Sequence, residues 1–374
     1  MSFFARFACR IVFGAGIAVL SLVAAYADEE TKPFIPRIIL SSTIPANGDL
    51  NPYGIAFVPD GFASGGIIAP GDVLVSNFNA SNNFQGTGTT IIKLTPNSAV
   101  APAVPAGQNG NAFTYFAGQQ PGLTLALGVL RRGFVIVGNV PTTDGTSATV
   151  ADGTLQVADR NGKHVATLTD HVFFDSPWGL TVYDLGDTAQ IFVANVLSGN
   201  VSRLDVAVSP TGIVIKRRTV IATNYTHRTD PAALVLGPTG LLYDPNADVL
   251  YVASTADNAI FAVPRAGKAT FPVNKGTVVF ADAQVLRGPL ALAFTPSGNL
   301  ITSNGDAVNS DPTHPSEVIE FTKSGKFVRQ YNIDPAPDGA FGVATVLGPD
   351  ARFNFAAVND NNNSVAVYAL PQDE

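Results

Sequence analysis

Two pairs of side chains in this sequence have the types and spacing for acid–base chemistry. His227 precedes Asp230 by three residues, and His314 precedes Glu317 by three. An imidazole titrates near neutral pH, and a carboxylate beside it can orient it as a general base. A histidine in a loop is also commonly solvated or bonded to local groups. The catalytic and the purely structural interpretations of these four residues therefore both stay open.

A second set of polar residues is defined by repetition. Asparagine follows an apolar run at five equivalent places, with Ser254 at the sixth, namely Asn77, Asn139, Asn195, Asn304 and Asn359. A ring of amide oxygens can coordinate a hard cation such as Ca²⁺ or bind sugar hydroxyls. Alternatively, each asparagine caps the turn that follows it, which the near-perfect repetition favours. The candidate ligand-binding residues are Asn51, Asn77, Asn195, Asn304 and Asn359.

The chain elements that carry these residues are copies of one unit. A short motif, usually Pro-x-small followed by alternating apolar residues, recurs at intervals of 51 to 69 residues, at 52–57, 121–126, 177–182, 238–243, 289–294 and 340–345. Short apolar runs separated by turn residues follow each copy, as in a propeller blade with loop insertions. The last unit lacks its fourth run, whereas an unassigned run at 37–42 precedes the first motif. Closure removes an exposed sheet edge, so we predict an all-β, six-bladed β-propeller with four antiparallel strands per blade, closed by the N-terminal strand.

One stretch of the repeat resembles a known family. Residues 237–241, 250–253 and 257–260 look like an NHL repeat, a six-bladed propeller unit related in shape to streptogramin lyases and to the gluconolactonase and regucalcin group. The resemblance spans nearly all of residues 37–370 and implies the fold rather than a function. The gluconolactonase group carries a metal-binding Glu at the start of an inner strand, but no Glu occurs here between Thr31 and Ser316. That metal site is therefore not carried over. His314 and Glu317 are similar in type to the lyase residues, without aligning to the lyase motif.

The predicted blades place most polar loop residues on one face. In a four-stranded antiparallel blade, the connections from strand two to three and from strand four to the next blade share a face. Asp175 and Asp338 immediately precede inner-strand motifs, which makes them the candidate carboxylates for an axial divalent cation such as calcium. We expect a small molecule, a glycan or a protein to bind at this face. No other cofactor is expected.

Composition and the N-terminus narrow the classes of function. Only 22 Lys and Arg residues and a net charge of −7 provide no basic surface for nucleic acid. Residues 1–27 have a signal peptide's pattern, with Arg6 and Arg10, an apolar run and Ala25-Tyr26-Ala27 before the cleavage point. We therefore expect one propeller domain at 28–374, secreted or periplasmic, without an integral membrane segment after cleavage. Two functions stay open, a ligand-binding or partner-binding propeller and a metal-dependent hydrolase or lyase.

Overall fold

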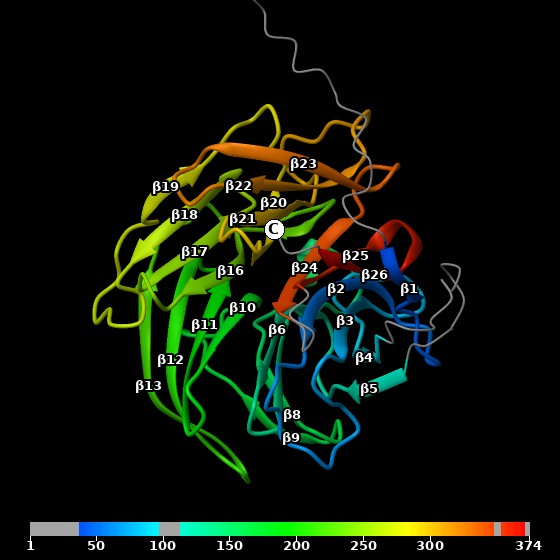
Figure 1. Cartoon of the computed structure of the whole chain (residues 1–374), viewed down its shortest axis with the longest axis vertical. Coiled ribbons are helices and arrows are strands. Elements are labelled where there is room, and N and C mark those ends of the chain that lie inside the picture. The colour runs from blue at the N-terminus through cyan, green and yellow to red at the C-terminus, as the bar shows by residue number, and fades with distance from the viewer. Residues whose placement is uncertain (1–36, 97–112, 348–352, 371–374) are drawn as a thin grey trace, which may run out of the picture. The chain divides into compact units, whose positions relative to one another are not determined.

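The computed structural model describes residues 37–96, 113–347 and 353–370. These residues form six four-stranded antiparallel sheets, which are the blades of a β-propeller (Figure 1). The innermost strands contact one another in the order β2, β6, β10, β16, β20 and β24, and β24 returns to β2. The fold class predicted from the repeat is confirmed.

The first three blades follow the chain without interruption, each running from its inner to its outer strand. Blade one contains β2 (Leu50–Phe57), β3 (Val73–Asn79), β4 (Thr90–Leu94) and β5 (Phe113–Ala117). Blade two contains β6 (Leu123–Leu130), β7 (Phe134–Asn139), β8 (Leu155–Asp159) and β9 (His164–Leu168). Blade three contains β10 (Pro177–Asp184), β11 (Thr188–Asn195), β12 (Asn200–Ser209) and β13 (Gly212–Ala222).

The last three blades repeat this order, except that the sixth takes its outer strand from the start of the chain. Blade four contains β16 (Pro238–Asp244), β17 (Val249–Ser254), β18 (Ala259–Pro264) and β19 (Thr277–Phe280). Blade five contains β20 (Pro289–Phe294), β21 (Leu300–Asn304), β22 (Ser316–Phe321) and β23 (Phe327–Asp334). Blade six contains β24 (Ala340–Leu347), β25 (Phe353–Asn359), β26 (Ser364–Leu370) and β1 (Arg37–Ser42).

The N-terminal strand closes the ring as predicted. β1 pairs antiparallel with β26, so that Leu40 lies opposite Ala366 and Ser42 opposite Ser364. In Figure 1 the blue β1 therefore lies beside the red β26. The pairing covers the edge of β26, which would otherwise present unpaired backbone groups.

The repeated motif has a structural meaning that the sequence pattern alone does not show. At its start, each of the six inner strands in the described structure shifts register against its neighbour, for example between Pro52 and Ile55 and between Ala340 and Val343. The shift brings the small residue of the motif against the backbone of the next blade. A Cβ atom at Gly54 would lie 2.6 Å from the carbonyl oxygen of Thr124. The motif is therefore the contact by which successive blades pack around the axis.

Apolar side chains fill the spaces between adjacent blades. Ile55 and Val75 of blade one pack with Val358 and Val365 of blade six, and buried apolar clusters also lie between the other neighbouring pairs. This arrangement explains why the second strands read as continuous apolar runs, since both of their faces are buried.

Three short elements were not predicted. One is a two-stranded hairpin of β14 (Arg228–Asp230) and β15 (Leu234–Leu236), which comes between blades three and four along the chain. The other two are the 3₁₀ turns η1 (Ser147–Thr149) and η2 (Asp360–Asn362). The predicted signal peptide at 1–27 lies outside the described residues. Within the described part of the chain, no helix has the length and apolar character needed to cross a membrane.

Candidate functional site

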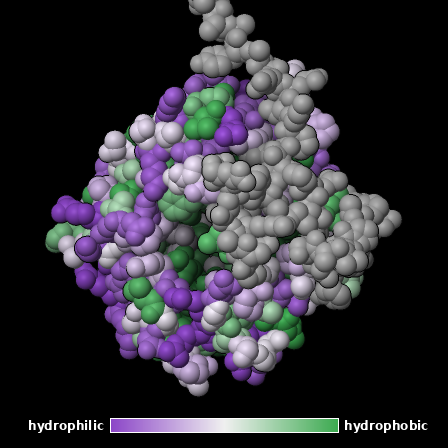
Figure 2. Space-filling view, in the orientation of Figure 1, coloured by the Kyte–Doolittle hydropathy of each residue, from purple (hydrophilic) through white to green (hydrophobic). Residues whose placement is uncertain are grey.

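A pocket of about 510 Å³ opens on the axis of the propeller. Its walls come from the starts of inner strands, such as Asn51, and from the loops after second strands, such as Asn83 and Asp306. These are the connections that the sequence predicts on one face. A second cavity of about 380 Å³ is lined by the far halves of the inner strands, with apolar residues such as Leu127 and Val346. Figure 2 shows apolar residues gathered in a hollow near the middle of a largely hydrophilic surface.

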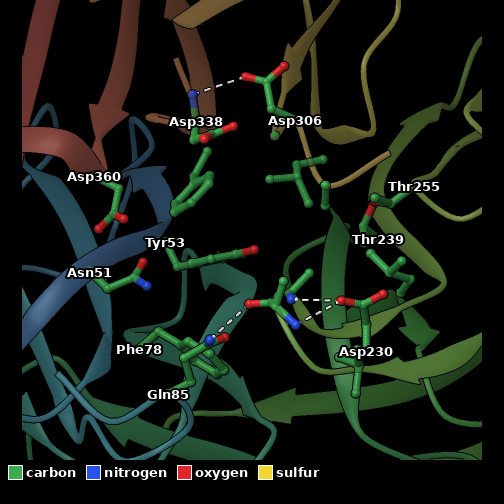
Figure 3. A pocket seen from close by; sticks show the side chains of 18 of the residues that line it. Asn51, Tyr53, Phe78, Gln85, Asp230, Thr239, Thr255, Asp306, Asp338 and Asp360 are labelled. Atoms are coloured by element: carbon green, nitrogen blue, oxygen red, sulfur yellow. Dashed lines mark hydrogen bonds between the residues drawn. The ribbon is translucent and has the colours of Figure 1, made fainter. Parts of the chain in front are cut away.

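Aromatic rings form the inner wall of the first pocket. The Tyr53 ring lies 4.6 Å from that of Phe341 and 5.4 Å from those of Phe78 and Trp178, measured between centroids. All four side chains line the pocket, and Tyr53 extends into its middle (Figure 3). Burial raises the pKa of the Tyr53 phenol, so this hydroxyl stays protonated. The rings offer both an apolar surface and one hydroxyl to a ligand.

Four aspartates stand around these rings (Figure 3). Asp338 precedes β24, Asp306 follows β21, Asp360 begins η2 and Asp230 ends β14. The backbone N–H of Asp338 donates to Asp306 Oδ2 at 3.1 Å. Burial raises the pKa of Asp306 to about 6, and that of Asp360 also to about 6. Burial raises the pKa of Asp338 as well.

The unpredicted hairpin contributes one side of the pocket. Asp230 Oδ1 accepts from the backbone N–H groups of Ala232 and Ala233, both at 3.0 Å, which holds the turn of the hairpin. Gln85, from the loop after β3, donates its Nε2 to the carbonyl oxygen of Ala232 at 3.1 Å. Blade one and the hairpin therefore meet at the pocket (Figure 3).

The first predicted acid–base pair is divided between two places. Asp230 lines the pocket, whereas His227 is exposed and does not line it. Asp230 instead lies 3.8 Å from the guanidinium of Arg228. The imidazole of His227 lies near Asp175, whose pKa is raised by burial despite this imidazole. His227 and Asp230 therefore do not form the acid–base pair that their spacing in the sequence suggested.

The second predicted pair is adjacent but lies outside the pocket, with Glu317 buried and His314 partly exposed. His314 Nδ1 lies 3.8 Å from Glu317 Oε2, and neither atom has a hydrogen-bond partner in the described structure. Glu317 Oε1 accepts from Arg287 Nη1 at 2.9 Å and from Asn304 Nδ2 at 3.1 Å. Burial raises the pKa of Glu317 to about 7, although Arg287 opposes the shift. The carboxylate chiefly anchors Arg287, a partner that sequence reasoning missed.

The predicted asparagine ring is structural in most of its members. Asn51 lines the pocket, but Asn77, Asn195, Asn304 and Asn359 do not. These four are buried, and their amide nitrogens donate to groups of the protein. The acceptors are Thr43 O at 3.1 Å for Asn77, Asn200 Oδ1 at 2.7 Å for Asn195, Val285 O at 2.8 Å for Asn304 and Asp334 Oδ2 at 2.6 Å for Asn359. Asn359 also accepts from the N–H of Asn361 in the turn that follows it, whereas Asn77 and Asn304 bond to loops that precede their blades' inner strands. The four amides therefore connect segments of the propeller, and turn capping describes only part of their role.

The two candidate metal carboxylates are not brought together at the pocket. Asp338 lines it, whereas Asp175 lies with Ser198 and Asp152 and does not. Across the described residues, no three His, Cys, Asp or Glu side chains converge as metal ligands. This donor arrangement does not fit the axial calcium ion suggested by the sequence, so no step is derived through a metal.

Sequence reasoning missed Asp306 and Asp360 as site residues. Both follow closely the asparagine that ends a second strand, Asn304 in one blade and Asn359 in another. A search for acids just beyond the repeated asparagine finds them, because the chain turns at that point toward the axis. The asparagine recurs in five of the six blades, whereas an acid follows it closely in only some of them.

Comparison with known proteins extends the description of the fold only. No family model matches the chain, and no curated protein is similar to it in sequence. Among solved structures it is similar to regucalcin from Agrobacterium tumefaciens, a calcium-binding protein, at 12% identity over 88% of this chain and 94% of that one, with a TM-score of 0.45. A glucose dehydrogenase matches at 16% identity over 90% and 99%, with a TM-score of 0.47. A chain of a nidogen/laminin complex matches at 15% over 76% and 88%, with a TM-score of 0.46.

The fold and the site together define a class. The chain is a six-bladed β-propeller that carries, on its axis, a pocket with aromatic rings within and carboxylates around them.

Proposed function

We propose that this protein is a ligand-binding β-propeller that holds a small polar organic molecule in its axial pocket. The observation that carries the proposal is the pocket itself. Its volume of about 510 Å³ lies in the range of small-molecule sites, and it combines aromatic rings with a few convergent polar groups. The proposal in its wider form also includes a glycan or a protein as the molecule bound at this face.

The metal-dependent hydrolase or lyase receives no comparable support. Its proposed bases lie outside the pocket, since His227 is exposed and His314 contacts the buried Glu317. Its proposed carboxylates, Asp175 and Asp338, do not share the pocket. Binding is therefore the function that the geometry supports best.

The test uses a natural reporter. Trp178 is the single tryptophan of the sequence and lines the pocket, so a ligand bound there changes its fluorescence. We expect a panel of sugars, amines and small acids to contain at least one compound that shifts Trp178 emission and raises the melting temperature. A panel without any such compound contradicts the proposal.

A matched pair of variants assigns the effect to the pocket. Ala307 is exposed at the pocket wall, so Ala307→Phe places a ring in the pocket without disturbing the core. Ala46 is also exposed but does not line the pocket. We expect Ala307→Phe to abolish the emission change and Ala46→Phe to retain it.

The proposal includes export from the cytoplasm, which rests on the signal-peptide pattern of residues 1–27. Mass spectrometry of the exported protein is expected to find Asp28 at its N-terminus. Retention of the preceding residues contradicts cleavage at this site.

A further inference from the structure

The axial pocket has a surplus of negative charge. Among the described residues its lining contains four aspartates and no Lys, Arg or His. Asp306, Asp338 and Asp360 form no ion pair within the described structure, and Asp230 meets only the exposed Arg228, at 3.8 Å. Asp306 is buried, and a buried charge without a partner is costly, so the carboxylates of this pocket favour a positively charged occupant.

Hydrogen-bond acceptors without partners add to the negative character of the pocket. Asp306 is only 6% exposed, and its Oδ2 accepts from the N–H of Asp338. Asn51 lines the pocket and has a buried Oδ1 atom without a partner in the described structure. Asn79 is 3% exposed, also lines the pocket, and has an Oδ1 atom without a partner there. Buried polar atoms are normally hydrogen-bonded, so exceptions at a pocket wall indicate a missing donor.

The aromatic rings distinguish an organic cation from a metal ion. A metal ion requires several oxygen ligands that converge on one point, and no three acidic or imidazole groups of the described residues do so. The four carboxylates instead surround Tyr53 (Figure 3). The Tyr53 ring lies 4.6 Å from that of Phe341, which also lines the pocket. Aromatic faces attract ammonium groups through their electrostatic quadrupole.

We propose that the ligand of the axial pocket is an organic ammonium compound, with its charged nitrogen beside Asp306 and Asp338 and its alkyl groups against Tyr53 and Phe341. This inference rests on the proposed function, because it names the chemical class of the molecule that the pocket binds. Charge, unpaired acceptors and rings each point to the same class.

The experiment compares three probes by Trp178 emission and calorimetry at neutral pH. Choline carries the ammonium charge, and glucose is a neutral polyol. The neutral carbon isostere of choline is 3,3-dimethylbutan-1-ol, called dimethylbutanol below. We expect choline to bind about tenfold or more tightly than dimethylbutanol, as one desolvated cation–π contact is worth about 2 kcal/mol and tenfold is about 1.4 kcal/mol.

Charge-neutralising variants connect the preference to named residues. Asp306→Asn and Asp338→Asn keep the side-chain shape and remove one charge each. Each is expected to weaken choline binding about threefold to tenfold, which is about 0.6–1.4 kcal/mol, without changing dimethylbutanol binding. Asp60→Asn is the matched control, because Asp60 is exposed and does not line the pocket.

The outcomes separate this inference from the proposed function. Equal binding of choline and dimethylbutanol, or binding of glucose alone, overturns the cation preference and leaves the pocket a binding site. Choline binding that survives both variants also overturns it. If none of the three probes changes Trp178 emission, the ammonium inference is wrong, and the wider panel then decides whether the pocket binds anything.

Discussion

Gly342 in β24 lies directly against the carbonyl oxygen of Tyr53 in β2, so close that a Cβ atom at residue 342 would overlap it. This contact joins the last inner strand to the first. Gly179 faces the carbonyl oxygen of Thr239 in the same way, one blade to the next. The small residue of the repeated motif therefore sets how closely the blades approach the axis, and Tyr53 is also central to the pocket.

Gly342→Ala tests this contact. The added methyl group must push β24 away from β2, and overpacking of this kind costs about 1–3 kcal/mol of unfolding free energy. Chemical denaturation measures the change. Gly212→Ala is the control, because no atom lies within 4 Å of the added Cβ there. Equal stability of the two variants contradicts the packing role.

Removal of β1 tests the closure of the ring. Deletion of residues 28–43 exposes the edge of β26, and we expect the melting temperature to fall by many degrees, with an increased tendency to aggregate. Scanning calorimetry and light scattering measure both effects. A melting curve identical to that of the protein retaining residues 28–43 means that β1 contributes nothing to closure.

The pocket carboxylates predict the pH dependence of stability. The pKa of Asp306 and of Asp360 is raised to about 6 from the ordinary 3.8, so the folded state binds more protons than the unfolded state between these values. The contribution of these two carboxyls to the free energy of unfolding therefore falls as the pH rises from about 4 to about 6, by at most about 3 kcal/mol per carboxyl, and is constant above that range. Urea denaturation at several pH values measures this slope. Asp306→Asn and Asp360→Asn should each flatten it, whereas Asp60→Asn should not.

The hydrogen bonds of the buried asparagines predict a stability effect at Asn139. Its Nδ2 donates to Pro121 O at 2.8 Å, and its Oδ1 accepts from the N–H and the hydroxyl of Thr154. Asn139→Ala leaves these buried groups unpaired, at a cost of about 2–4 kcal/mol. Asn246, which is exposed and has no side-chain hydrogen bond in the described structure, is the control. Thermal denaturation of both alanine variants gives the comparison, and equal melting temperatures contradict a stabilising role for these hydrogen bonds.

The separation of Asp175 from the pocket predicts indifference to calcium. Because no three His, Cys, Asp or Glu side chains of the described residues converge on one point, we expect neither Ca²⁺ nor a chelator to move the melting temperature. Differential scanning fluorimetry with each reagent measures this. A rise with Ca²⁺ that Asp338→Asn removes restores the axial cation.

The sequence by itself determined the blades and their closure. Each blade is a local unit of short apolar runs and turns, repeated with its motif that is usually Pro-x-small, so periodicity is sufficient to count the blades. The unassigned run at 37–42 could be placed because it had no partner and the sixth blade lacked a strand. Pairing the run with that blade resolves both. The repeated asparagine was recognisable in the sequence, but its partners were not, because Asn139 bonds to Pro121 and Thr154, which are distant along the chain.

Only the tertiary structure decided the site. Asp230, Asp306, Asp338 and Asp360 come from distant parts of the chain and meet because closure of the ring brings their loops to one axis. Spacing along the sequence instead favoured a pair of His227 and Asp230. Asp230 belongs to the hairpin and lines the pocket, whereas His227 precedes the hairpin and does not line it. Local patterns report local geometry, whereas a pocket on a propeller axis depends on the packing of all the blades, which no single stretch of sequence encodes.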